Sequence, residues 1–437
     1  MSAPSPLDRQ KLRTGWAAYG APRARWRIGG EYERAVVRGS GGHVAYHDPD
    51  GIAWILEALR ARTGWKAKDE DGNVVELSGD DASITLEPGG QVELSGAPWS
   101  RLDDLAAEVR ANRDHLVDIA RGHDLHWIAA GMTPFASVPD IPFVPKGRYR
   151  VMQSYLPQYG PKAHWMMKGT CSVQGNWDYA DEEDCQRKFH VALDLAPLTT
   201  AMFANSPLHR GQATGFQSWR AWIWTRTDPA RTGFPPGVRD RYSHDGWIDY
   251  LLDAPMMFTR VDGAWVPADG ITFRTWMRDG IDGRFPSPTD WDLHQTSVFP
   301  EVRVKRTIEI RSADAVNVDL AVAFCAFWTG LLYGPGALVA ARGVADRLLA
   351  TGGGPEDRHL VAARSGLDAR FGTLGAADLA RELVTLARGG LVEIGENASL
   401  IEPLAARVDS GRSPARDVMD AYDRDPSPAN VLRAFAY

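Results

Sequence analysis

The 437-residue sequence has few cysteines and lacks the short motifs that many enzymes use to hold nucleotides or nucleophiles. Its three cysteines, Cys171, Cys185 and Cys325, form no CxxC pair, which disfavours a thiolate metal site and a disulfide framework. Neither GxxxxGK(S/T) nor GxGxxG occurs, so metal ions and side chains would have to hold the phosphates of any bound nucleotide. No GxSxG nucleophile elbow is present either.

The chain also lacks an excess of positive charge. Its formal net charge of −7 disfavours nucleic acid or an anionic membrane as a partner, because both need a concentrated basic surface. We therefore expect small-molecule partners and a monomer or homodimer. The first residues, MSAPSPLDRQKLRTGW, contain no apolar core of the kind a signal peptide requires, and the sparse cysteines suit a reducing compartment. These features predict a cytoplasmic protein.

Uncharged runs are rare, and the longest informative one covers residues 320–341. The sequence Gly334-Pro335-Gly336 interrupts it and leaves about 14 apolar residues, fewer than the roughly 20 that a spanning helix needs. The run therefore predicts a buried helix and no membrane span.

No repeat, low-complexity segment or clear linker divides the chain. Residues 1–335 mix strand-like and helical patterns, whereas residues 336–437 are mostly helical in pattern. We therefore expect an α+β protein with a catalytic body over 1–335 and a helical C-terminal part, 336–437, packed on the same domain.

Two segments show the periodicity of surface helices. Residues 101–125 carry an apolar stripe with charges opposite, and residues 376–391 repeat the type with a Gly389-Gly390 stop. The inward residues predicted for the first helix are Leu105, Val109, Leu116, Ile119 and Ala120, and those for the second are Leu379, Leu383 and Leu386.

Four other segments alternate apolar and polar residues, as strands do when their two faces differ. In RWRIGGEYER the polar face carries Glu31 and Glu33, and in QVELSG it carries Gln91 and Glu93. In GTCSVQGNWD it includes Gln174 and Asn176. In VRVKRTIEIR it carries Arg303, Lys305, Thr307, Glu309 and Arg311, whereas Arg306 interrupts the apolar side.

A sheet with one face in water would explain any one of these strands. Taken together they favour a site, because carboxylates gather on the first two strands and cations on the last. Glu87 and Glu93 also flank a Pro88-Gly89-Gly90 break with no lysine or arginine nearby in the sequence. A hard divalent cation such as Mg²⁺ relieves repulsion among carboxylates, and arginine suits phosphate oxygens. This combination indicates phosphoryl transfer.

The pattern as a whole resembles glutamate–cysteine ligases of the plant and proteobacterial type, within the carboxylate–amine ligase superfamily. The matching stretches occur in the family's order and span about residues 25–335. They are GGEYE (29–33), LEPGGQVELSGAP (86–98), IPFVPKGRYRVM (141–152), MMKGTCSVQGNWD (166–178), ANSPLHRGQATGFQSWRAWIWTRTDPARTG (204–233) and FPEVRVKRTIEIRSAD (299–314). The resemblance implies a glutamine-synthetase-like, mostly antiparallel sheet that forms a cupped active site, with helices packed on its outer face.

The resemblance also implies an ATP-dependent reaction that joins the γ-carboxylate of L-glutamate to the amine of L-cysteine through γ-glutamyl phosphate. Two or three Mg²⁺ ions would be held by Glu31, Glu33, Glu87, Glu93 and Glu309. Arg220 would bind the α-carboxylate of glutamate, with Gln174 or Asn176 lining the same cavity. Arg303, Lys305 and Arg311 would stabilise the transferring phosphoryl group, and Lys146 and Arg148 would bind ATP.

The sequence departs from the family pattern at a few positions. Gly30 and Tyr32 replace the threonine and histidine of the commoner Gly-Thr-Glu-His-Glu motif, and Gly175 and Trp177 replace a valine and a leucine. These changes leave open an alternative acceptor amine in a specialised pathway. A binding protein that merely keeps the fold would have lost some of the carboxylates, and none is missing.

Overall fold

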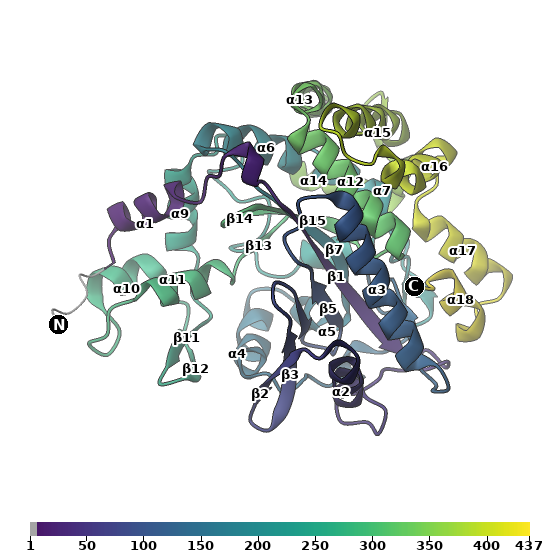
Figure 1. The fold of residues 1–437 in the computed structure, drawn as a ribbon, viewed down its shortest axis with the longest axis horizontal. Helices are drawn as coiled ribbons and strands as arrows, with labels where there is room; N and C mark the ends of the chain where they lie inside the picture. The colour runs from purple at the N-terminus through teal and green to yellow at the C-terminus, as the bar shows by residue number, and fades with distance from the viewer. Residues whose placement is uncertain (1–6) are drawn as a thin grey trace.

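The computed structural model describes residues 7–437 and centres on one large sheet (Figure 1). Its nine strands pair only antiparallel, in the order β14-β15-β7-β1-β5-β4-β3-β2, with β6 beside β1. The strands are β1 (Ile28–Val37), β2 (Lys66–Glu70), β3 (Asn73–Ser78), β4 (Ser83–Leu86), β5 (Val92–Ser95), β6 (His126–Ile128), β7 (Ser172–Trp177), β14 (Val302–Val304) and β15 (Ile308–Asp314). The α+β class and the mostly antiparallel sheet are confirmed. The first six residues of the N-terminal stretch considered above lie outside the described part.

Strand pairing brings together polar residues that are far apart in the sequence. Strand β1 lies between β5 and β7, so Glu33 is opposite Glu93 and Glu31 is opposite Gln174. On the next strand, Glu309 of β15 is opposite Asn176 of β7. All these side chains belong to one face because side chains alternate along a strand.

Helices cover the other face of the sheet. The longest are α3 (Leu102–Ala120) and α12 (Val318–Tyr333), and both contact β1. The predicted stripe of α3 is confirmed for its four larger residues, which are buried, whereas Ala120 is half-buried. Further helices in this part are α2 (Ile52–Thr63), α6 (Glu182–Asp194) and α7 (Ala196–Phe203).

Helix α12 is the buried helix predicted from the uncharged run, and all of its residues except Asp319 are buried. It ends before Gly334, where the chain turns by 98° into α13 (Pro335–Leu349). Among residues 7–437 no single helix is long and apolar enough to cross a membrane, although this bent pair meets the criterion by length and composition.

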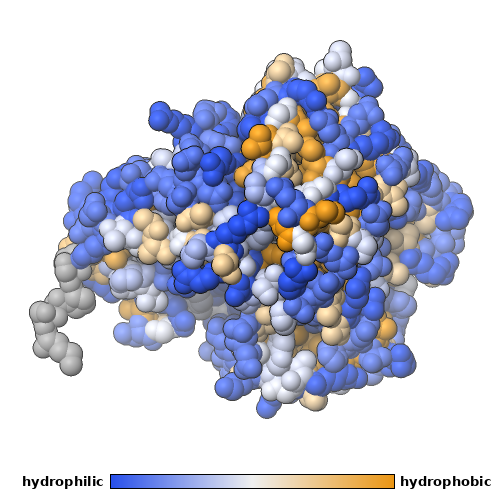
Figure 2. Space-filling model, turned by 45° about the horizontal axis from the view of Figure 1, so that its top comes forward, coloured by the Kyte–Doolittle hydropathy of each residue, from blue (hydrophilic) through white to orange (hydrophobic). Residues whose placement is uncertain are grey.

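The C-terminal residues form helices, and those before residue 411 join the same apolar core as α12, whereas those after it pack in a second, smaller cluster with Val37 and Ile128. The helices are α13, α14 (Pro355–Ser365), α15 (Ala376–Glu393), α16 (Glu402–Ser410), α17 (Pro414–Arg424) and α18 (Pro428–Ala434), with a short hairpin of β16 (Arg370–Phe371) and β17 (Leu374–Gly375). On the face drawn in Figure 2, apolar residues gather over this helical side, and the part of the molecule at the left of the view is mainly hydrophilic.

The predicted stop at Gly389-Gly390 is wrong, because α15 continues to Glu393. These glycines do not end the helix, and Gly390 instead allows α15 to approach α12 closely. A Cβ atom on Gly390 would lie 2.1 Å from the carbonyl oxygen of Gly330. Leu379 and Leu383 are buried as expected, whereas Leu386 is half-buried.

A second lobe stands beside the polar face of the sheet (Figure 1). It contains α1 (Arg9–Ala17), α9 (His244–Asp253), α10 (Phe273–Asp279), α11 (Pro288–Gln295) and the hairpin of β11 (Phe258–Val261) and β12 (Ala264–Pro267). The other short elements are α4 (Gly147–Tyr155), α5 (Ala163–Gly169), α8 (Trp219–Trp224), β8 (Leu208–His209), β9 (Gln212–Ala213), β10 (Thr232–Gly233) and β13 (Phe299–Pro300). Leu208 of β8 packs with Val418 and Val431 of the C-terminal helices.

Candidate active site

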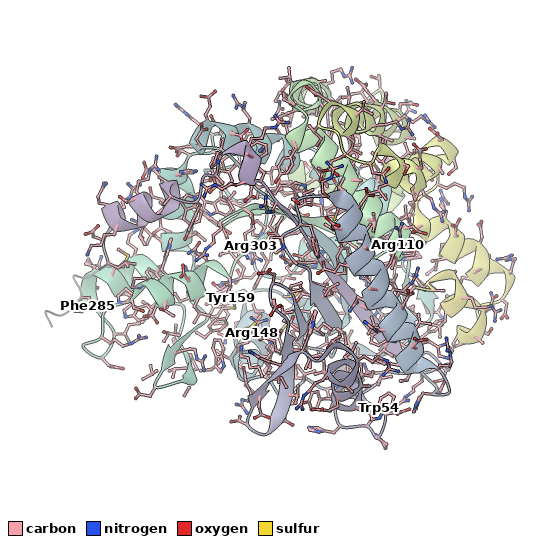
Figure 3. All side chains as sticks on the ribbon, viewed as in Figure 1. Trp54, Arg110, Arg148, Tyr159, Phe285 and Arg303 are labelled. Carbon is pink, nitrogen blue, oxygen red and sulfur yellow. The ribbon has the colours of Figure 1, made fainter. Side chains whose placement is uncertain are left out.

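The polar face of the sheet forms the floor of a cavity of about 300 Å³. Its walls come from α4, α5 and α8 and from Phe258 of β11. In Figure 3, Arg303 and Arg148 mark two sides of the central region where this cavity lies. The charged lining residues are Glu31, Glu33, Glu87, Glu93, Arg148, Arg220, Arg303, Lys305 and Arg311.

Four carboxylates from separate parts of the chain meet in this cavity. Glu31 and Glu33 project from β1, Glu93 projects from β5, and Glu87 follows β4. Both oxygens of Glu33 accept hydrogen bonds, from the backbone N–H of Ser172 at 2.6 Å and from Nε2 of Gln174 at 2.9 Å. The convergence of these carboxylates, which the strand patterns predicted, is therefore observed.

Two more contacts orient the carboxylates. Oε2 of Glu93 accepts a hydrogen bond from the hydroxyl of Thr85 at 2.7 Å. Oε1 of Glu31 accepts one from Nδ2 of Asn176 at 2.8 Å. These neutral donors fix the carboxylates without neutralising their charge.

Burial and repulsion by neighbouring carboxylates raise the proton affinity of Glu33 and Glu93. Burial, followed by the charge of Glu87, raises the pKa of Glu33 to about 7. Burial raises the pKa of Glu93 well above its ordinary value, and the charges of Glu31, Glu87 and Glu33 add to the effect. The site thus has a deficit of positive charge on its carboxylate side.

The opposite side of the cavity holds a compact ion cluster around Glu309. Arg303 donates to both oxygens of Glu309, from Nε at 2.9 Å and from Nη2 at 2.8 Å. Nζ of Lys305 lies 3.2 Å from the same carboxylate, and Arg311 also donates to it. Although burial alone would raise the pKa of Glu309, the charges of Arg303, Lys305 and Arg311 hold it well below its usual range.

This cluster changes the interpretation of Glu309. Its oxygens are occupied by three cations, whereas the four carboxylates of the cavity form none of the ion pairs found in residues 7–437. Metal binding by Glu309 stays a prediction, and the observed role of this residue is to hold Arg303 and Arg311 in place. Arg303, Lys305 and Arg311 all line the cavity, as the sequence predicted.

Arg220 enters the cavity from α8, and a buried carboxylate fixes that helix. Asp314 accepts hydrogen bonds from the hydroxyls of Ser206 at 2.6 Å and Ser218 at 2.8 Å. Ser218 is the N-cap of α8, and the backbone N–H of Arg220 donates to Ser206. Nη2 of Arg220 donates to the carbonyl oxygen of Arg311 at 3.0 Å, while its buried Nε has no protein partner. Arg220 itself lines the cavity.

No lysine or arginine is close to the Glu87–Glu93 hairpin in the sequence, but two cations are close to it in the folded chain. In the folded chain, the charges of Arg148 and Lys146 interact with that of Glu87. Arg148 lines the cavity and donates to the hydroxyl of Tyr149 at 2.9 Å. Lys146 lies behind that wall, where burial lowers its pKa to about 8 and Nζ is 3.4 Å from the carbonyl oxygen of Leu86. Direct ATP contact by Lys146 stays a prediction.

The side-chain amides of Gln174 and Asn176 line two different cavities. Gln174 lines the main cavity, whereas Asn176 lines an adjacent hollow that also includes Lys305. The amide of Asn176 bridges Glu31 and the hydroxyl of Thr307, which donates to Oδ1 at 2.9 Å. The resemblance implied Gln174 or Asn176 in the cavity with Arg220, and Gln174 is the one that lines it.

Sequence reasoning missed the apolar wall of the cavity. Met166 and Met167 line the cavity together with Met152, Trp224 and Phe258. No motif marks them, because an apolar residue facing a cavity looks like a core residue in the sequence.

The departures from the family motifs lie on the helix-covered face. A Cβ atom on Gly30 would lie 2.1 Å from the hydroxyl of Tyr32, and one on Gly175 would lie 2.4 Å from the ring of Trp177. Each large ring therefore fills the space that a larger neighbour would need. Tyr32 and Trp177 contact α12 through Cys325 and Thr329, away from the carboxylates.

The chain is similar to known glutamate–cysteine ligases. The model of glutamate–cysteine ligase family 2 matches residues 27–433. The chain is 35% identical to a chloroplastic glutamate–cysteine ligase A of Oryza sativa subsp. indica, over 96% of this chain and 85% of that protein. It is also 35% identical to the chloroplastic glutamate–cysteine ligase of Arabidopsis thaliana, over 96% of this chain and 81% of that protein.

Solved structures share the fold at much lower sequence identity. A glutamate–cysteine ligase from Francisella tularensis in complex with AMP superposes with a TM-score of 0.57 at 13% identity, covering 94% of this chain and 87% of that one. A bifunctional glutathione synthetase from Pasteurella multocida gives a TM-score of 0.53 at 12% identity, covering 94% and 52%. With the family model matching nearly the whole chain, this protein belongs to glutamate–cysteine ligase family 2, a family of enzymes.

Proposed function

We propose that the protein joins the γ-carboxylate of L-glutamate to the amine of L-cysteine at the expense of ATP, with Mg²⁺ as the metal. The observation that carries the proposal is the single cavity with unneutralised carboxylates on one side and cations on the other. Phosphoryl transfer needs this combination, since it depends mainly on positioning and on neutralising spreading negative charge.

The carboxylate side fits a hard divalent cation. All of its charged donors are carboxylate oxygens, the ligands that Mg²⁺ prefers. The pKa values of Glu33 and Glu93 are raised because too little positive charge lies nearby to stabilise their charged forms. Among residues 7–437, no group of three or more acidic, histidine or cysteine residues already has the arrangement of a metal site. We infer that Glu31, Glu33, Glu87 and Glu93 would hold Mg²⁺, which would neutralise phosphate charge and make the terminal phosphorus more electrophilic.

The chain's own residues would orient the two amino acids. Arg220, which lines the cavity, suits the α-carboxylate of glutamate, because arginine binds carboxylates with several donors at once. The apolar wall of Met152, Met167 and Phe258 suits a small uncharged acceptor side chain such as that of cysteine. A charged side chain would lose its hydration against this wall.

The proposed chemistry has two steps. An oxygen of the γ-carboxylate attacks the terminal phosphorus of ATP, the bond from phosphorus to the bridging oxygen breaks, and ADP leaves. The neutral amine then attacks the carbonyl carbon of γ-glutamyl phosphate, phosphate leaves, and the amine gives up a proton. Arg303, Lys305 and Arg311 would balance the charge on the phosphoryl oxygens.

A panel of acceptor amines tests the proposal. Purified protein with ATP, Mg²⁺ and glutamate should release ADP and form a γ-glutamyl product when cysteine is added. Serine and aspartate serve as polar and charged comparisons of similar size. ADP release with another amine and none with cysteine would disprove the acceptor assignment, and no ADP release with any amine would disprove the ligase proposal.

A further inference from the structure

Arg231 is a completely buried arginine that does not line the active-site cavity and has no part in the proposed reaction. It directly precedes β10, and its side chain is 0% exposed. Its charge is paired with Asp228 through a hydrogen bond of 2.6 Å from Nε to Oδ2. A buried arginine lowers stability unless its charge is paired and its donors are satisfied. The partners of its remaining donors therefore indicate its role.

These donors reach three segments that are far apart in the sequence. Nη1 of Arg231 donates to the carbonyl oxygen of Ser297 at 2.9 Å. Nη2 donates to the carbonyl oxygen of Pro255 at 2.7 Å and to the hydroxyl of Tyr155 at 3.3 Å. Two of these acceptors are backbone carbonyls, so the contacts fix the path of the main chain. One guanidinium thus joins α4 to two segments of the second lobe.

Each of the three segments also supplies a lining residue of the active-site cavity, one to three positions away from its contact with Arg231. These lining residues are Met152 of α4, Phe258 of β11 and Thr296 at the end of α11. The first two belong to the apolar wall that suits the side chain of the acceptor amine. This wall therefore comes from separate segments that are held together behind it by one buried side chain.

We propose that Arg231 is a positioning residue that sets the spacing of this apolar wall and thereby the fit of the acceptor amine. The inference rests on the proposed function. The glutamate end of the cavity is anchored separately, because Ser206 and Ser218 hold the start of α8 through hydrogen bonds to Asp314. The spacing set by Arg231 therefore governs the binding of the acceptor and not that of glutamate.

Arg231→Lys tests this role, because lysine keeps the charge beside Asp228 and removes the fork of donors. The backbone link from the N–H of Phe299 to the carbonyl oxygen of residue 231 stays in place. Steady-state kinetics are measured with glutamate and with the acceptor that the unmodified protein uses, cysteine in the proposal. We expect the KM for the acceptor to rise about tenfold, while kcat and the KM for glutamate change less than about twofold. A residue with only a structural role would lower the midpoint of urea unfolding and leave both KM values unchanged.

Two further variants complete the experiment. Tyr155→Phe removes a single acceptor of Arg231 and carries the test if Arg231→Lys does not fold. It should raise the KM for the acceptor amine about threefold. Arg274→Lys is the matched control, since Arg274 also joins two helices of the second lobe, through Asp249 and Asp253. It lies outside the cavity lining, and its kinetic parameters should equal those of the unmodified protein.

The outcomes separate this inference from the proposed function. An unchanged acceptor KM in a folded Arg231→Lys protein, or an equal rise in the KM for glutamate, would overturn the role of Arg231. If only Tyr155→Phe folds, an unchanged acceptor KM in that variant would overturn it. Absence of turnover by the unmodified protein with every amine would overturn the proposed function itself, together with this inference.

Discussion

The two faces of the central sheet are built from the same strands, but different requirements restrict their residues. On the cavity face, Glu31 and Glu33 are half-buried, and burial together with the charge of Glu87 disfavours the charged form of Glu33. On the helix face, Gly30 and Tyr32 fit together as a packing pair. Residues on the first face are fixed by chemistry, whereas those on the second can change as long as their volumes match.

The largest expected effect is the loss of turnover when a carboxylate of the cavity face is removed. Glu93→Gln removes a proposed metal ligand and should lower kcat at least about a hundredfold, because even changes to outer metal-site residues cost 10- to 100-fold. The folded state should be no less stable, since the substitution removes a buried charge that its neighbours repel. ADP-release assays and urea unfolding measure the two quantities.

Glu76→Gln is the matched control for that variant. Glu76 lies on β3 of the same sheet, outside the cavity, and pairs with Lys68 at 2.9 Å. Its activity should be unchanged. Normal turnover in Glu93→Gln would contradict the assignment of the cavity face.

A smaller effect on the same cavity concerns glutamate alone. Arg220→Ala should raise the KM for glutamate by a factor that corresponds to about 1.5 to 3 kcal/mol, the range for a charge-assisted hydrogen bond. Arg226→Ala removes a nearby arginine that stacks on Trp222, and it should leave this KM unchanged. Steady-state kinetics with each substrate varied in turn distinguishes the outcomes. A change confined to the KM for cysteine would contradict the assignment of Arg220 to glutamate.

On the helix face, the expected effect is on stability rather than turnover. Gly30→Thr should lower the free energy of unfolding by about 2 kcal/mol, because the added atoms overlap the hydroxyl of Tyr32. The double variant Gly30→Thr/Tyr32→His removes the obstructing ring and should recover at least about 1 kcal/mol of that loss. Additive losses in urea unfolding would show that the two residues do not form a pair.

His294 lies outside both faces of the sheet, and its expected effect is confined to the pH dependence of stability. Burial lowers the pKa of His294 to about 4, and its Nε2 lies 2.6 Å from the carbonyl oxygen of Leu251. Below pH 6.5 the unfolded chain binds a proton at this residue that the folded chain rejects, so stability falls as the pH drops toward 4.

Between pH 7 and pH 5 the contribution of His294 should lower the free energy of unfolding by about 2 kcal/mol. His294→Gln should lose this part of the pH dependence in urea unfolding at the two pH values. His126→Gln, at an exposed histidine of β6, should retain it. An equal pH dependence in all three proteins would show that His294 is not the group responsible.

Local patterns in the sequence predicted much of the fold and the site. The alternation in GGEYE and QVELSG placed Glu31, Glu33 and Glu93 on a common face, and the antiparallel pairing of β1 and β5 set Glu33 beside Glu93. The break at Gly334 likewise marked the end of α12. These features depend on the period of a strand or helix, which is written in neighbouring residues.

The same reasoning failed where partners are distant in the chain. The helix pattern at Gly389-Gly390 gave no sign that Gly330 would lie against it. The cationic strand did not reveal that Glu309 would gather Arg303, Lys305 and Arg311 around itself. Such contacts follow from packing, and a single sequence carries no record of which distant residues meet.

The sequence by itself determined that carboxylates and cations occupy separate strands with one polar face, because side-chain direction follows from position along a strand. Only the tertiary structure decided which charges neutralise one another. It brought Arg148 and Lys146 to the hairpin, closed the Glu309 cluster, and left four carboxylates in one cavity without an equal number of paired cations. The reason is physical: charge interactions fall with distance through space, and only folding sets that distance.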